Sequence, residues 1–531
     1  MTIALDAPVV ASRTWRHRWP LGTIIAPVVG VGLVLTIWAI GGRAGWGSGM
    51  VVTPAEAIRP IVGSSRDVYM RATSATVWSA FRGLVIGSAL AFVAALIAAT
   101  VPALRRAISR LAAIANAAPW VAVAPCLLVI LGRDRGPVAV AAIAVFFFVF
   151  VSTSIGLGSA PVAAHDVLTA LGSSRRVRVL SVQLPACWPS VLDGLKLGAP
   201  AAMAGAIFGE WYGAPRGLGV LLLSAMQSGR AERLWAASLL SAGCGLVAFG
   251  VLAAIRAALV PRYGAVIAQG QTSAEIAKRS SRLRTTVVEL ATVAVLVAGM
   301  VAAWWIWIDA ADISPLVVPR PSRVWRDISG SFGDYASATG STLATAGIAF
   351  LLGAFVGMAV AVVASRIRVF AGAAVPLIVV LAATPIIALF PLFARVFGYQ
   401  PSTVRILAAT MVFFPVFVYT RSGLAAASRP ATDVVTALGA STNRRLSLLT
   451  LPAAVPHVAS GCRIAAGSSV IAAVVGESLI GSVGLGVQFS YSYRLLKLPH
   501  AFGAAIAIIV VSVAVFAAAG SIERAVHARW S

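Results

Sequence analysis

Charged residues are scarce in this sequence, and acidic residues are the scarcest. Charged residues make up 11% of the 531 positions, with 17 Asp and Glu against 42 Lys and Arg, whereas soluble globular chains are about one quarter charged. Hydrophobic residues make up 59%, and the mean hydropathy is +0.92. These values exclude an ordinary soluble globular protein. No nucleic-acid-binding motif accompanies the net charge of +25, which is therefore typical of basic loops facing the cytoplasm and anionic headgroups.

Cysteine is also sparse. The 4 cysteines stand singly and form no C-x-x-C pair, which argues against a disulfide framework and against a metal site. No G-x-x-x-x-G-K-[ST] phosphate-binding loop occurs, and the stretch most like it, GLKLGAP from Gly194, has the wrong spacing. No H-E-x-x-H, paired carboxylates or nucleophile constellation is present either. We therefore predict that this chain is not an enzyme and carries no cofactor.

Long apolar runs, by contrast, are abundant. The runs 22–40 and 501–520 reach the ~20 residues that cross a hydrocarbon core as a helix. The first run is long for a signal peptide and has no clear small-residue cleavage site after it, so it is predicted to be retained as a first helix. We expect an all-α membrane protein with about 12 transmembrane helices, near 22–41, 76–100, 111–131, 138–158, 198–213, 236–259, 286–308, 341–364, 372–394, 404–424, 464–480 and 501–520.

One polar stretch occurs twice. DVLTALGSSRRVRVLSVQLPA begins at Asp166, and DVVTALGASTNRRLSLLTLPA begins at Asp433, an offset of 433 − 166 = 267 residues. Other features recur at nearly the same offset, including Glu210 with Glu477 and the Gly-Leu-Gly stretches at 217–219 and 484–486. The chain is therefore predicted to be a tandem duplication. Its expected parts are a first repeat at 1–260, a cytoplasmic linker at 261–285 and a second repeat at 286–531.

The number of helices in each half sets the relation between the halves. Six expected helices per half is an even number, so both halves insert in the same direction. This gives parallel repeats related by a pseudo-two-fold axis along the membrane normal. Placing both termini in the cytoplasm puts a modest majority of Lys and Arg inside. Both copies of the polar stretch are then cytoplasmic.

Each copy of the polar stretch is predicted to form two short helices joined at a glycine. Gly172 and Gly439 can end the first helix, because glycine adopts positive φ without steric cost. Pro185 and Pro452 are expected to bend the chain toward the next membrane helix. A simple connection is the alternative, but helix–helix connections are commonly about 2–8 residues. The length and the repetition of the stretch favour a repeated contact with a partner.

These stretches resemble the cytoplasmic EAA loop of ABC importer permeases, E-A-A-x-x-x-G followed by a proline. Asp166 and Asp433 take the acidic position, and Gly172 and Gly439 take the glycine position; Val-Leu and Val-Val stand where the family has two alanines. The Leu-Pro, Pro and Gly-Leu-Lys pattern that follows is similar to the nitrate/sulfonate/taurine branch. The chain thus resembles two type I (MetI-like) permease domains fused in tandem.

The resemblance implies an ATP-driven importer in a bacterial cytoplasmic (inner) membrane. Two ATP-binding cassette subunits would dock on the loops and hold ATP and Mg, and an extracytoplasmic solute-binding protein would deliver a small anionic solute, such as a sulfonate, taurine or nitrate. Alternating access would move the solute inward. The residues implied in coupling are Asp166, Ala170, Leu171, Gly172, Pro185, Asp433, Ala437, Leu438, Gly439 and Pro452.

Glu210 and Glu477 are candidate residues of the translocation path. Ionisable groups at membrane depth are costly and therefore indicate function. The alternative is an interfacial carboxylate, which for Glu210 would pair with Arg216. Paired prolines would bend the third helix of each half, as suits a helix beside a path but also an ordinary membrane helix. These candidate path prolines are Pro119, Pro125, Pro385 and Pro391.

Two other functions remain as alternatives. An ion-coupled secondary transporter built from parallel repeats would place charged residues near the centres of its spans, whereas most charge here avoids them. A membrane-embedded enzyme would need a catalytic constellation, and His165 and His457 stand at non-equivalent places in the two loops. The ABC importer permease is therefore the favoured interpretation.

Overall fold

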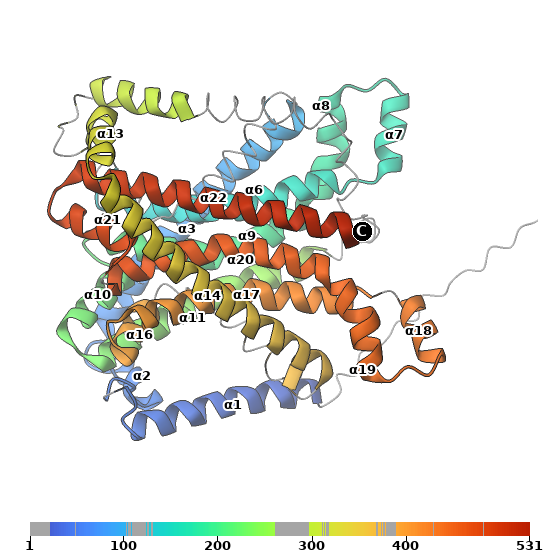
Figure 1. Cartoon of the computed structure of the whole chain (residues 1–531), viewed down its shortest axis with the longest axis horizontal. Helices are drawn as coiled ribbons and strands as arrows, with labels where there is room; N and C mark the ends of the chain where they lie inside the picture. The colour runs from blue at the N-terminus through green and yellow to red at the C-terminus, as the bar shows by residue number, and fades with distance from the viewer. Residues whose placement is uncertain are drawn as a thin grey trace, which may run out of the picture.

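The computed structural model describes residues 22–260 and 297–530, except most of 102–130 and 368–388 and single positions near 48, 311–317, 428 and 482. All regular structure in these residues is helical (Figure 1). The first half contains α1 (Gly22–Arg43), α2 (Pro54–Val62), α3 (Arg66–Thr100), α6 (Gly136–Gly158), α7 (Val162–Ala170), α8 (Arg175–Arg178), the π-helix η1 (Val179–Gln183), α9 (Leu184–Glu210), α10 (Leu218–Ser228) and α11 (Ala231–Leu259).

The second half repeats this order. Its elements are α13 (Pro321–Gly330), α14 (Phe332–Arg366), α16 (Phe390–Phe397), α17 (Pro401–Ala425), α18 (Arg429–Ala437), α19 (Thr442–Arg445), η6 (Leu446–Thr450), α20 (Leu451–Ile480), α21 (Leu485–Arg494) and α22 (Leu498–Trp530). The long helices α3 and α14 both have 35 residues. Even the five-residue π-helices recur, at an offset of 446 − 179 = 267. The structure therefore repeats with the same offset as the sequence.

Eight helices of the described residues are long and apolar enough to cross a membrane. They are α3, α6, α9 with the turns before it, α11, α14, α17, α20 with the turns before it, and α22. Shorter apolar helices at Val29–Arg43 and Val297–Ala310 occupy the first and seventh expected spans. The expected spans near 111–131 and 372–394 and the linker at 261–285 lie largely or wholly outside the described residues.

Both repeated loops lie at one end of the molecule. Figure 1 shows α7 and α8 together with α18 and α19 at the right-hand end, where α22 also finishes and α1 begins, whereas α2, α10, α13, α16 and α21 lie at the other end. Equivalent segments of the two halves thus point the same way. The predicted all-α membrane fold of two parallel repeats is confirmed.

Small residues let the helices of each half approach closely. Gly83 and Gly87 of α3 face Ala141 and Ala142 of α6, and a Cβ on Gly87 would overlap the Ala142 carbonyl group. Gly205 of α9 lies against the same α6 segment, where an added Cβ would come within 2.8 Å of the Ala141 Cα. Such crossings are typical of membrane bundles, where van der Waals packing replaces the hydrophobic effect between helices.

The two halves meet at the end away from the loops. One apolar core contains Phe208 from the first half and Phe390 and Phe489 from the second, all almost fully buried. In addition, Arg395 of α16 donates from Nε (3.1 Å) and from Nη2 to the carbonyl of Met226, near the end of α10. A cationic donor at a helix C-terminus satisfies a carbonyl that has no partner within the helix. The described contacts between the halves therefore hold the molecule together opposite its loops.

Candidate functional site

The first repeated loop is a helix that turns at a glycine and leads into a second helix. α7 ends at Ala170, and Gly172 has a φ of +70°. The N–H of Ser173 donates to the carbonyl of Leu168 at 3.0 Å, which gives one of the last carbonyls of α7 a partner. The predicted turn at Gly172 is thus present in the structure.

The second loop has the same geometry. α18 ends at Ala437, Gly439 has a φ of +74°, and the N–H of Ala440 donates to the carbonyl of Val435 at 3.2 Å. A Cβ on Gly172 or Gly439 would meet no atom within 4 Å. Glycine is therefore required here by the backbone conformation and not by lack of space.

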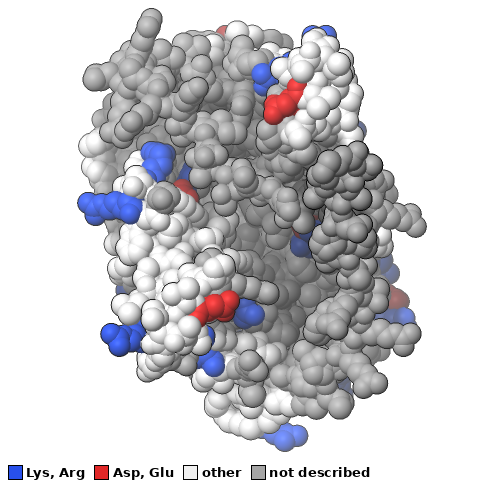
Figure 2. Space-filling view, turned by 90° about the vertical axis from the view of Figure 1, so that its right-hand side faces the viewer, with Lys and Arg blue, Asp and Glu red and all other residues white. Residues whose placement is uncertain are grey.

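Large apolar side chains project from both loops. Leu171 is 76% exposed and Leu438 is 79% exposed, and one helical turn earlier Val167 and Val434 are 59% and 58% exposed. Asp166 and Asp433, each next to one of these valines, are exposed as well. Figure 2 looks onto this end of the molecule, where most of the described charged side chains are basic. The two loops thus expose the same pair of apolar side chains outside the membrane helices.

The second helix of each loop is tied to a long membrane helix by an arginine. In the first half, Arg175 of α8 donates from Nε to the carbonyl of Ala99, near the end of α3, at 2.8 Å. In the second half the arginine is on the membrane helix instead, and Arg366 of α14 donates to Asn443 of α19 at 2.7 Å. The same junction is therefore made with the arginine on opposite partners. Each loop is linked to α3 or α14 as well as to the helix that follows it.

Pro185 and Pro452 differ from their expected role. The sequence predicts a bend at each Leu-Pro, but α8, η1 and α9 run on as one apolar helical span, Arg175–Glu210, with an equivalent span in the second half. The five-residue π-helix lies directly before the Leu-Pro pair in both halves. Proline lacks an N–H and crowds the preceding turn of a helix. The wider π turn accommodates each proline without ending the helix.

Glu210, at the end of α9, is buried and fully hydrogen-bonded. Only 2% of its surface is exposed. Thr76 of α3 donates to Oε1 and Oε2 at 2.8 and 3.0 Å, and the N–H of Gly219 donates to Oε2 at 2.8 Å. The N–H of Leu218 donates to the Thr76 hydroxyl at 2.8 Å. The carboxylate thus binds the N-terminus of α10, where helix N–H groups lack partners, and Arg216 is not among its described partners.

Glu477 makes the same arrangement in the second half, with 3% of its surface exposed. Thr342 of α14 donates to Oε2 at 2.8 Å, as does the N–H of Gly486 at 3.1 Å. The N–H of Leu485 donates to the Thr342 hydroxyl at 2.9 Å. Oε1 of Glu477 has no partner among the described residues. We refer to the two sets, Thr76–Glu210 and Thr342–Glu477 with the N–H groups they bind, as the carboxylate caps.

The Gly-Leu-Gly stretches are explained by the carboxylate caps. Gly217 and Gly484 have φ values of +146° and +116°, and a Cβ on either would overlap the capping carboxylate. A Cβ on Gly219 would overlap the carbonyl of Ile207. Each glycine therefore lets the start of the short helix approach the end of the membrane helix. The motif has a structural cause, whatever else the two glutamates do.

The sequence did not single out two residues of the carboxylate caps, Thr76 and Thr342. They are separated by 342 − 76 = 266 residues, as are Pro119 and Pro385, since 385 − 119 = 266. This repetition is the one signal in the sequence that could have identified them. Among the predicted path residues, Pro391 is buried near the start of α16. Three others lie outside the described residues, namely Pro119, Pro125 and Pro385.

Comparison with known proteins gives one family for both halves. The sequence pattern described as "Binding-protein-dependent transport system inner membrane component" matches residues 83–264 and again 349–531. An ABC transporter permease protein of Haemophilus influenzae is 27% identical over 222 residues, which are 42% of this chain and 91% of the relative. The formylaminopyrimidine transport permease protein ThiX of Halalkalibacterium halodurans is 31% identical over 173 residues, 32% of this chain and 69% of the relative.

Relatives named for other solutes are similar to the same extent. The aliphatic sulfonates transport permease protein SsuC of Bacillus subtilis is 26% identical over 222 residues, 41% of this chain and 79% of the relative. Nitrate and taurine permeases of Synechocystis and Escherichia coli are 29% and 27% identical over 147 and 210 residues. Each relative aligns with less than half of this chain, which fits a chain that contains the permease domain twice.

Proposed function

Because this chain belongs to the family of binding-protein-dependent transport system inner membrane components, the permeases of ABC importers, we propose that its two halves enclose one path for an imported solute. The chain is a multi-pass membrane subunit of a transporter and not an enzyme. The matches at 83–264 and 349–531 support a division into repeats at 1–260 and 286–531 with a linker at 261–285. The path would run between the halves, with the paired prolines and the two glutamates on the helices around it.

The two loops are proposed to receive two ATP-binding subunits, one each. The observation that carries this proposal is the pair of exposed leucines, Leu171 and Leu438, at the same end of the molecule. A pair of apolar side chains at the tips of two protruding loops suits two equivalent grooves on a partner. ATP and Mg would be held by those subunits. Their closure would draw the loops together and rock the halves between inward- and outward-facing states.

The loop end is proposed to face the cytoplasm, together with both termini. The basic side chains on this end (Figure 2) fit the excess of Lys and Arg found on cytoplasmic segments. The opposite end, where α10 and α16 meet, would then face outward and receive an extracytoplasmic solute-binding protein. Relatives named for aliphatic sulfonates, nitrate and taurine support a small solute, anionic in this branch.

Docking is tested by exchanging the exposed leucines. The full chain carrying Leu171→Asp and Leu438→Asp, co-expressed with the ATP-binding subunit encoded beside its gene, should insert normally but no longer copurify with that subunit. Val62→Asp is the control, because Val62 is 69% exposed at the opposite end. Each single variant should keep one subunit, which mass photometry of the purified complex can count.

The same preparation separates the alternatives. In liposomes, the wild-type complex should hydrolyse ATP, and the variant with both Leu171→Asp and Leu438→Asp should not. Copurification that is unchanged by both exchanges would refute docking through these loops. Solute uptake driven by an ion gradient in liposomes that contain this chain alone would instead support the ion-coupled secondary transporter.

A further inference from the structure

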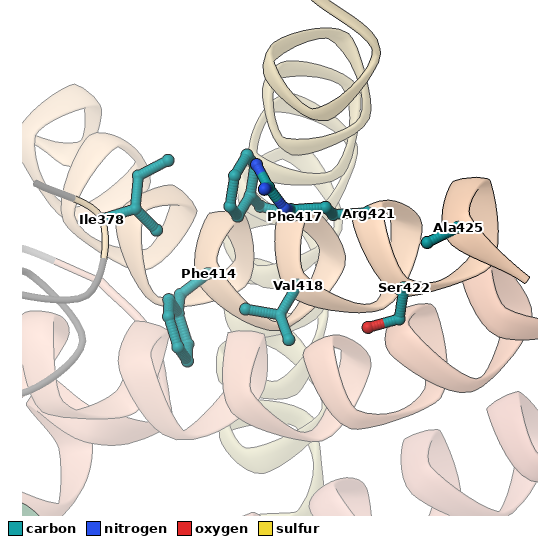
Figure 3. Close-up of a pocket in the computed structure, with 7 residues that line it drawn as sticks. All are labelled: Ile378, Phe414, Phe417, Val418, Arg421, Ser422 and Ala425. Atoms are coloured by element: carbon teal, nitrogen blue, oxygen red, sulfur yellow. The ribbon is translucent and has the colours of Figure 1, made fainter. Parts of the chain in front are cut away.

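A cavity of about 300 Å³ lies beside the last turns of α17, at the end of that helix nearest the loops. Figure 3 shows six of its lining residues along α17 and one, Ile378, on the neighbouring segment. The lining is mostly apolar and contains two aromatic rings. The described lining residues are Ile378, Phe414, Phe417, Val418, Arg421, Ser422 and Ala425.

Arg421 is the one charged side chain among the described lining residues. It has no ion pair or hydrogen bond with another described residue. Two other cations on the membrane helices do have acidic partners, since Lys196 contacts Asp193 at 3.2 Å and Arg463 contacts Glu523 at 2.7 Å. The Arg421 side chain is exposed, so its guanidinium can reach an anion, and the apolar lining beside it favours an anion that brings apolar surface of its own.

The cation is present in one half only. The equivalent of Arg421 in α6 is Ser154, because 421 − 154 = 267, and Gly423 is matched by Gly156 in the same register. Phe414 and Phe417 have counterparts in Phe147 and Phe150, so the aromatic part of the lining is repeated and the charge is not. The charge beside the cavity therefore belongs to one half only, which suits a ligand that has a single anionic group.

We propose that this cavity binds an organic monoanion with an apolar body, a sulfonate or carboxylate, as an inner site for the transported solute. This rests on the proposed function. The anionic group would lie at Arg421 and the apolar body between Phe414, Phe417 and Ile378. A zwitterion such as taurine would leave its ammonium without a carboxylate, and nitrate would leave the apolar lining uncovered. The site thus narrows the solutes suggested by the relatives.

The test measures binding to the purified full chain in phosphatidylcholine nanodiscs, without any ATP-binding subunit. The probe is benzenesulfonate, and its matched neutral probe is benzenesulfonamide. Titration calorimetry should show saturable binding of benzenesulfonate at one site, and weaker or no binding of the sulfonamide, taurine and nitrate. Arg421→Ser, which installs the first-half residue, should weaken binding tenfold or more, because a hydrogen bond to a charged group is lost.

Further variants keep the test decisive if one of them folds poorly. Arg421→Lys should retain part of the binding, Ala425→Leu should abolish it by filling the cavity, and the control Ser154→Ala should bind like the wild type. Equal binding of the sulfonamide, or no effect of Arg421→Ser, would overturn the proposal. Arg421-dependent retention of phosphatidylglycerol without probe binding would show a lipid site and overturn the proposal.

These outcomes are separate from those of the docking test. Failure of the ATP-binding subunits to associate would refute the proposed function and leave the calorimetric result standing as a binding site of another kind. Normal ATP-dependent assembly with no binding of benzenesulfonate would refute the inner site alone.

Discussion

The carboxylate cap of the first half predicts a large effect for one small substitution. Thr76→Val keeps the shape of the side chain but removes the hydroxyl that donates to Glu210 and accepts from the N–H of Leu218. Losing a hydrogen bond to a charged group costs about 1.5–3 kcal/mol, and leaving a buried N–H unpaired costs about 1–3 kcal/mol. These costs overlap in one side chain and are not strictly additive. We therefore expect Thr76→Val to lower the free energy of unfolding by about 3 kcal/mol.

The chain offers a matched control on the same helix. Thr73, also on α3, has a buried hydroxyl with no hydrogen-bond partner among the residues that the structure describes, so Thr73→Val should be neutral or slightly stabilising. Unfolding of both variants in mixed micelles by sodium dodecyl sulfate, followed by circular dichroism, measures the difference. A difference of less than about 1 kcal/mol between Thr76→Val and Thr73→Val would refute the hydrogen-bond account of the cap.

Two further predictions concern the end of the molecule opposite the loops. Gly217→Ala should sharply reduce the yield of monodisperse protein in size-exclusion chromatography, because its Cβ would overlap the Glu210 carboxylate. Gly213→Ala is the control, because Gly213 also has a positive φ, +121°, but a Cβ added there would meet no atom within 4 Å. Equal yields of the two variants would contradict the overlap. The hydrogen bond from the backbone N–H of Thr53 lowers the pKa of Glu56, so the capping contribution to α2 is present at neutral pH and lost as pH falls through the folded-state pKa. In the wild type, amide protection factors in the first turn of α2 should fall on acidification. In Glu56→Gln they should change little with pH, and identical pH profiles of the two proteins would count against the cap.

The conformation of the repeated loops could be predicted from the sequence, because it depends on residues that are close together along the chain. A glycine at the end of a short polar helix predicts a positive φ, and the structure gives +70° at Gly172 and +74° at Gly439. The exposure of Leu171 and Leu438 follows from their position beside these turns. The uninterrupted helix through Pro185 was not predicted, because a π turn depends on how the preceding residues pack and not on the proline alone.

The two glutamates show where sequence reasoning stops. Their position at the ends of apolar segments was visible, but their burial and their partners were not, because Thr76 lies 134 residues from Glu210 and Thr342 lies 135 residues from Glu477 along the chain. A threonine in an apolar helix commonly bonds its own backbone. Only the crossing of α3 with α9 brings this hydroxyl to the carboxylate.

By itself the sequence determined the class of protein, the duplication, the loops and the family. Each of these follows from composition, from a constant offset between repeated stretches, or from residues a few positions apart. Hydropathy over ~20 residues and a repeat at a constant offset need no knowledge of packing. The tertiary structure alone decided what Glu210 and Glu477 bind, that an arginine ties each loop to a long helix from opposite sides, and that Arg421, which has no partner among the described residues, lies beside a cavity. Those facts depend on which helices cross and at which residue, and distances of that kind arise only when the whole chain is packed.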